Sequence, residues 1–111
     1  MRPHLNRRLT LEAPTRTPDA AGGYSTAWSA LGTLWAEVAP DLARLDAVPG
    51  GATARARLRV TVRAAPPGAP ARPQAGQRFR EGLRLFPIDA VQEADPTGRH
   101  LLCLAHEEAS R

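Results

Sequence analysis

Apolar and polar residues alternate in short stretches along most of the chain, and each stretch predicts a β-strand with one buried face. The stretches lie at residues 7–12, 24–28, 33–38, 54–63, 76–79, 83–91 and 100–107. In the last of them both faces are apolar, which indicates a strand that is covered on both sides. Pro14 and Pro40 are expected to end the first and third strands, and Pro87 indicates an edge or bulge position.

Turn-forming residues separate these strands. Gly22-Gly23 predicts a tight turn, so the first three strands form a β-meander. Residues 41–53 are the longest insertion and predict a long loop or a short helix, and residues 64–75 predict a semi-rigid, Pro-rich connection. Together the elements predict one domain over residues 1–111 with an all-β fold. The expected architecture is a small antiparallel β-barrel of six to eight short strands.

Composition narrows the class of protein. The 111 residues suit a single domain, and 42% hydrophobic residues favour a folded one. The formal charge is +4, and all 15 basic residues are arginines, so an acidic or nucleic-acid partner is allowed without being required. Cys103 is the only cysteine, which excludes an intrachain disulfide; its leucine neighbours predict a buried thiol. The sequence shows no secretory signal and no apolar run that would span a membrane, so no membrane partner is expected.

Signs of catalysis are weak. His4, His100 and His106 have no metal-ligand spacing with one another or with Cys103. The serines lack a nucleophile context, and the Gly-Gly pairs do not form a phosphate loop. We therefore expect no enzyme, no metal and no cofactor.

Four arginines share the polar face of the strand predicted at residues 54–63, namely Arg55, Arg57, Arg59 and Arg63. Such a row repels itself unless acidic groups or phosphates lie opposite. It is either a solvated face paired with acids of neighbouring strands, a subunit interface or channel face, or a contact with nucleic acid. A sheet dedicated to binding nucleic acid usually interleaves aromatic residues, and this face has none.

An ordered set of residues along the chain is similar to a known family. It consists of Arg8-Leu9-Thr10-Leu11, Pro14, Asp19, Gly22-Gly23, Trp28, Trp35-Ala36, Val38, Pro40, Leu58–Arg63, Gly76–Phe79, Phe86-Pro87-Ile88, Asp95-Pro96, Arg99, Leu101, Leu102 and Leu104. In this order the set resembles the head–tail joining proteins of tailed bacteriophages and gene transfer agents, also called head-closure or stopper proteins. The likeness covers nearly the whole chain and is weakest at residues 41–53 and 64–75.

The resemblance implies a structural connector without catalytic residues. It implies a homo-oligomeric ring, a hexamer or alternatively a dodecamer, that seals the DNA-filled head. Portal or adaptor proteins would lie on the head side, and tail terminator or tail tube proteins on the tail side. Double-stranded DNA would pass through the centre. The protein would be made in the cytoplasm of the bacterial host and would end in the neck of the virion or phage-like particle.

Three residues of the resembling set are expected to serve the core or the assembly, namely Trp28, Trp35 and Pro40. The two tryptophans are predicted on consecutive strands, where one would fill the barrel and the other would pack on the loop or on a neighbouring subunit. The rival interpretation is a basic, OB-like nucleic-acid-binding module. It is less favoured because the aromatic residues avoid the arginine strand.

Overall fold

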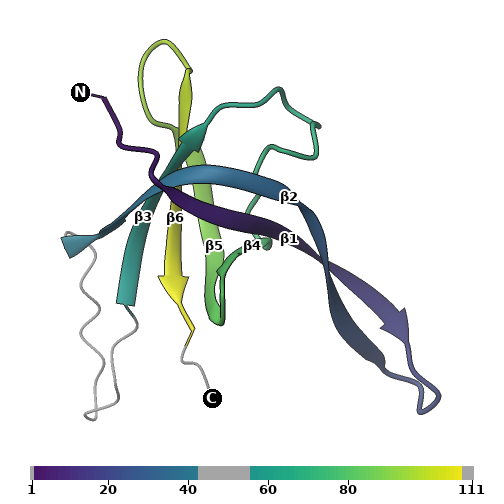
Figure 1. The fold of residues 1–111 in the computed structure, drawn as a ribbon. Coiled ribbons are helices and arrows are strands. Elements are labelled where there is room, and N and C mark those ends of the chain that lie inside the picture. Colours follow the sequence, from purple (N-terminus) through teal and green to yellow (C-terminus); the bar gives the residue numbers. More distant parts are fainter. Residues whose placement is uncertain (1, 43–55, 109–111) are drawn as a thin grey trace.

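The computed structural model describes residues 2–42 and 56–108 and contains six antiparallel strands. These are β1 (Arg7–Pro18), β2 (Tyr24–Pro40), β3 (Ala56–Arg63), β4 (Arg78–Glu81), β5 (Arg84–Glu93) and β6 (His100–Glu107). They pair in the order β1-β2-β3-β6-β5-β4, and the pairing of β1 with β4 closes a barrel (Figure 1). The predicted all-β fold with an antiparallel barrel is confirmed.

Two expectations concern segments between the strands. The loop or short helix predicted at residues 41–53 falls, apart from Asp41 and Leu42, outside the described residues. The Pro-rich connection between β3 and β4 is irregular and carries three short backbone turns, with Pro73 fully buried. Within the described ranges, no helix has the length and apolar character needed to cross a bilayer.

The barrel interior is filled by residues that alternate along every strand. The buried cluster consists of Leu9, Leu11, Ala36, Leu58, Val60, Val62, Phe79, Phe86, Ile88, Leu101, Cys103 and Ala105. The strand period of two places these side chains inward and their neighbours outward. The two phenylalanines face each other across β4 and β5, and both are fully buried. The core therefore depends on two aromatic rings that come from the second half of the chain.

The seam that closes the barrel is short. β1 pairs with β4 only through Thr10, Leu11 and Glu12, opposite Arg80, Phe79 and Arg78. In contrast, β1 pairs with β2 along its whole length, from Arg7 to Pro18. Closure therefore rests on three cross-strand pairs. Any interaction that stabilises these pairs also stabilises the closed barrel.

The predicted ends of the first strands are wrong. Pro14 does not end β1, which continues to Pro18, and residues 24–40 form one strand rather than two. Beyond Glu12, β1 pairs with β2 alone, and proline is tolerated on an edge strand because it needs no N–H donor there. A β-bulge opposite Leu11/Glu12 leaves Leu31 as the extra residue of β2, next to Gly32 with φ +149°.

The expectation that a tryptophan fills the barrel is also wrong. Trp35 is 56% exposed, because strand alternation turns it away from its buried neighbour Ala36. Trp28 is half-buried on the outer side of the sheet, and Pro40 is exposed at the end of β2. Both tryptophans lie on β2, not on consecutive strands. Their expected role in assembly stays a prediction.

Stability variants will separate the true core from the exposed rings. Phe79→Ala should lower the free energy of unfolding by about 3–5 kcal/mol, because it leaves a cavity in a closed interior. Trp35→Ala should cost less than about 1 kcal/mol, because an exposed ring leaves no cavity. Denaturant unfolding of the two purified variants measures both values. Equal losses in the two variants would contradict this assignment of the core.

Candidate functional site

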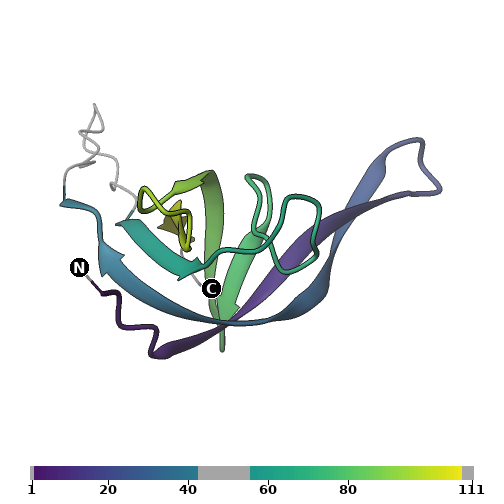
Figure 2. The ribbon, with the colours of Figure 1, turned by 90° about the horizontal axis from the view of Figure 1, so that it is seen from above.

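The most prominent surface feature is a two-stranded ribbon that projects from the barrel (Figures 1 and 2). We call residues 13–30 the β1–β2 ribbon: here β1 and β2 pair with each other and with no other strand. Its residues are exposed apart from the half-buried Ala13 and Trp28, and Tyr24 is 63% exposed. The only charged residues in it are Arg16 and Asp19. The ribbon therefore presents two open backbone edges and little charge.

The tip of the ribbon is held in one conformation by its own hydrogen bonds. The Asp19 carboxylate accepts N–H bonds from Ala21 and Gly23, each 2.9 Å long. The Asp19 N–H donates to the Gly23 carbonyl at 2.9 Å, and Gly22 adopts φ +84°, which favours glycine. The turn that the sequence predicts at Gly22-Gly23 is confirmed.

At the base of the ribbon, one carboxylate crosses the seam of the barrel. Glu12 on β1 is only 6% exposed and accepts hydrogen bonds from Arg78 Nε at 2.7 Å and Arg80 Nε at 2.8 Å, both on β4. The Arg78 guanidinium lies 4.0 Å from the ring centroid of Trp28. Trp28 thus covers the outside of the seam rather than filling the core.

The charge of Glu12 is stabilised by these contacts. Desolvation at its buried position raises the pKa of Glu12, but the hydrogen bonds and positive charges of Arg80 and Arg78 outweigh it, so the pKa lies below its usual value. The carboxylate therefore stays ionised and binds both arginines at neutral pH.

A second set of ion pairs joins four strands at their ends. Glu81 on β4 pairs with Arg7 on β1, and Arg84 on β5 forms two hydrogen bonds to Glu107 on β6, at 2.8 and 2.9 Å. The hydrogen bond from Arg7 lowers the pKa of Glu81, and the bonds from Arg84 lower the pKa of Glu107. These pairs are partly exposed, and each one contributes little to stability. They also mean that Glu81 and Glu107 are already paired with arginines of the same molecule.

The arginine face lies where the alternation of β3 predicts it. Leu58, Val60 and Val62 point into the core, and Arg57, Arg59 and Arg63 point outward; Arg55 lies outside the described residues. The arginines of this face differ in whether they form an ion pair. Arg57 Nη1 lies 3.2 Å from Asp89 Oδ2, while Arg59 and Arg63 form no ion pair with any described residue.

A β-bulge explains how Asp89 reaches Arg57. The register of β5 shifts between Ile88 and Ala90, so Asp89 is the extra residue and its carboxylate turns outward. His106 Nδ1 lies 3.0 Å from the same carboxylate. The sequence predicts an edge or bulge position at Pro87, and the bulge occurs at Asp89, two residues later.

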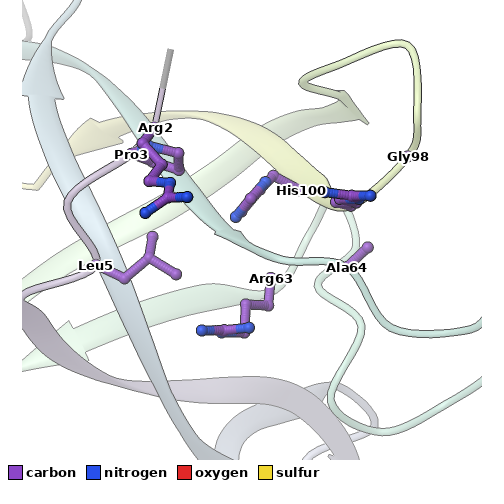
Figure 3. Close-up of a pocket in the computed structure, with 8 residues that line it drawn as sticks. Arg2, Pro3, Leu5, Arg63, Ala64, Gly98 and His100 are labelled. Carbon is purple, nitrogen blue, oxygen red and sulfur yellow. The ribbon is translucent and has the colours of Figure 1, made fainter.

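Beside the free end of the arginine face lies a groove of about 760 Å³. We call it the basic groove. It is lined by Arg2, Pro3, Leu5, Arg63, Ala64, Gly98, Arg99 and His100. Figure 3 shows Arg2, Arg63 and His100 around the same hollow, from the N-terminal segment, the end of β3 and the start of β6. The lining includes three arginines and no acidic residue.

Of the three arginines of this groove, sequence reasoning singled out only Arg63 as a candidate site residue. Arg63 belongs to the predicted arginine face, but Arg2 and Arg99 carry no local signal, because three distant segments bring them together. The Asp95 carboxylate lies 3.2 Å from Nδ1 of His100, which lines the groove. Hydrogen bonds from the Arg99 N–H and the Thr97 hydroxyl lower the pKa of Asp95 to about 2.

Groups capable of catalysis or metal binding do not gather elsewhere in the described part of the chain. Burial raises the pKa of the Cys103 thiol to about 12, so it is a packing residue, as the sequence predicts. His106 is occupied by Asp89 and His100 by Asp95. Among the described residues no cluster of three or more His, Cys, Asp or Glu could hold a metal ion.

The described residues thus form a closed small barrel with a projecting ribbon and an ordered ionic seam. Comparisons with known proteins indicate the class of protein to which this architecture belongs. The family model of the phage head completion protein matches residues 1–108. No curated protein matches the sequence.

Two solved structures share the fold over nearly the whole chain. A chain from the virion of a native gene transfer agent particle is 45% identical, with a TM-score of 0.82; the match covers 99% of this chain and 100% of that one. Protein SF1141 from Shigella flexneri 2a is 24% identical, with a TM-score of 0.65, and the match covers 96% and 95% of the two chains. The second likeness concerns the fold alone.

The chain belongs to the phage head completion protein family. This membership confirms the resemblance found in the sequence, and it identifies the chain as a structural protein of a phage-type virion. The description of the family agrees with an architecture made of ionic and packing contacts.

The seam makes a testable prediction about acid stability. Glu12→Gln should lower the free energy of unfolding at pH 7 by about 1–3 kcal/mol, because Arg78 and Arg80 lose a charged acceptor. A lowered pKa gives stability that is present above the usual pKa of 4.5 and is lost as pH falls through the folded value. The difference between wild type and variant should therefore shrink below pH ~4.5.

Denaturant unfolding at a series of pH values measures this difference. Glu108→Gln removes an exposed carboxylate that forms no ion pair with a described residue, and it serves as the matched control. A gap between wild type and Glu12→Gln that stays constant from pH 7 to 3 would show that the carboxylate does not stabilise the seam.

Proposed function

We propose that this protein completes DNA-filled heads by forming a ring between the portal or adaptor and the tail. The single observation that carries the proposal is the family match over residues 1–108. The likeness to a chain of a gene transfer agent virion supports the same role. In this role the ring seals the head, offers the docking surface for tail proteins and lets double-stranded DNA pass. A hexamer is the proposed assembly, with a dodecamer as the alternative.

The β1–β2 ribbon is the proposed arm of this assembly. A two-stranded hairpin without further packing is marginally stable in water, and open strand edges are sites for pairing with another chain. The ribbon has no core beneath it and little charge to repel a neighbour. In a ring with head-to-tail contacts, an arm of one subunit docks on a different surface of the next one.

Pairing through backbone edges suits such an arm. Main-chain hydrogen bonds supply binding strength, and the exposed Tyr24 supplies an apolar contact on one face. The barrel needs none of these residues for its own core. The free subunit is therefore expected to fold before it assembles.

The rival OB-like nucleic-acid-binding module has less support as the primary function. A free-standing module of that kind binds single strands with aromatic platforms on its sheet. The outer face of β3 presents Arg57, Arg59, Thr61 and Arg63 without an aromatic residue. The projecting ribbon would also have no role in such a module.

Shortening the ribbon tests the assembly role. In the variant, residues 15–27 are replaced by Asn-Gly, which joins the cross-strand pair Pro14 and Trp28 by a two-residue turn. The barrel should keep a melting temperature close to that of the wild type, because no core residue is removed. In a producing strain that lacks the natural gene, the variant should yield heads that leak DNA or lack tails, counted by electron microscopy.

A control with Thr15→Ser and Thr26→Ser keeps the length and the hydroxyls of the ribbon, so it should give tailed particles in normal number. Normal tailed particles from the folded, shortened variant would overturn the assembly role of the ribbon. Normal tailed particles from a strain with no copy of the gene would overturn head completion itself.

A further inference from the structure

Seven described arginines form no ion pair with a described residue, and four of them line two adjoining hollows of the barrel surface. They are Arg2, Arg8, Arg16, Arg59, Arg63, Arg72 and Arg99. Three of them line the basic groove, and Arg59 lines an adjoining hollow of about 370 Å³ that shares Pro3 and His100 with it. Three of the seven unpaired arginines thus surround one groove whose lining contains no acidic residue.

Acidic residues of the same chain are poor candidates to neutralise this groove in a neighbouring copy. Ion pairs within the barrel already occupy the carboxylates of Glu12, Glu81, Asp89 and Glu107, and the Asp95 carboxylate lies 3.2 Å from His100 Nδ1. The Glu37 carboxylate, which lines the adjoining hollow, accepts the His4 N–H at 2.9 Å. Asp19, Glu37, Glu93 and Glu108 form no ion pair with a described residue, but they come from four different segments, so no single strand of a second copy presents a row of acids to the groove.

From these observations we infer that the basic groove binds the phosphate groups of double-stranded DNA. Guanidinium groups match phosphate oxygens in geometry and stay charged at any physiological pH. A single carboxylate would neutralise only one of the three arginines, whereas a phosphate backbone presents a row of negative charges. This inference deepens the proposed function, on which it rests, by naming the surface of the chain that faces the DNA.

The shape of the groove indicates contact with the backbone and not with bases. Arg2, Arg63 and Arg99 come from three different segments and line an open hollow. The groove has no aromatic residue in its lining, so it offers no platform for unstacked bases. We expect binding that is independent of sequence, weak at high salt and suited to a duplex that moves past the protein.

The salt dependence of duplex binding measures how many arginines contact phosphates. A 30-base-pair duplex is titrated with the purified full chain at several NaCl concentrations. Each neutralised phosphate contributes a slope of about −0.9 to the plot of log K against log [NaCl], so three arginines predict roughly −2.7. Arg63→Gln should make the slope shallower by about 0.9, and the double variant with Arg99→Gln by about 1.8.

Two controls separate the groove from general charge. Arg16→Gln removes the same charge from the ribbon, where Arg16 stacks on Tyr24, and should leave the slope unchanged. Arg63→Lys keeps the charge and should keep the slope. Equal losses in Arg16→Gln and Arg63→Gln, or no duplex binding at 50 mM NaCl, would overturn the inference.

Further probes identify the source of the negative charge. Two duplexes of unrelated sequence should bind with equal affinity. A poly-glutamate peptide should bind less tightly than the duplex, and binding of the peptide alone, lost in Arg63→Gln, would overturn the inference in favour of an acidic protein partner. Because these measurements use the isolated chain, their failure would leave head completion in particles untouched.

Discussion

The closure of the barrel depends on one carboxylate. Glu12 faces two arginines of β4 across a seam that has only three residue pairs, and without this contact the seam would place two guanidinium groups side by side. The same residue marks the point where β1 leaves the barrel and becomes half of the ribbon. The stable core and the projecting arm therefore meet at a single ion cluster, covered on its outer side by Trp28.

The chain divides its arginines between two tasks. Arg7, Arg57, Arg78, Arg80 and Arg84 hold strands together through carboxylates of the same molecule. A second group, in and near the basic groove, has no such partner among the described residues. The net charge of +4 therefore comes from charged groups that are left over after the internal ion pairs are formed. The position of these groups on the surface says more about binding than the value of the net charge does.

Local patterns predicted some elements well because their side chains alternate without interruption. On β3, Leu58, Val60 and Val62 face the core and the arginines face outward, as alternation requires. Alternation also places Trp35 opposite Ala36, and the size of the ring misled the expectation of a core role. Pro14 was misread because a proline ends a strand or is tolerated in it according to distant pairing, which no local pattern contains.

The candidate sites were harder to predict from the sequence, because their residues are far apart along the chain. Glu12 and Arg78, which are in contact, lie 66 positions apart in the sequence. The basic groove is formed by the N-terminal segment, the C-terminal end of β3 and the turn before β6. Such convergence follows from topology, not from spacing along the chain. The family resemblance supplied the function class because it compares whole ordered sets of residues, including those without a local signal.

The bulge at Leu31 separates the geometry of the ribbon from that of the barrel. Because the ribbon contributes nothing to the core, two residues can be added to or removed from each of its strands without a change in the interior. Each such step changes the reach of the ribbon by about 7 Å and keeps every remaining side chain on its face. The length of the ribbon and the packing of the barrel can therefore change independently of each other.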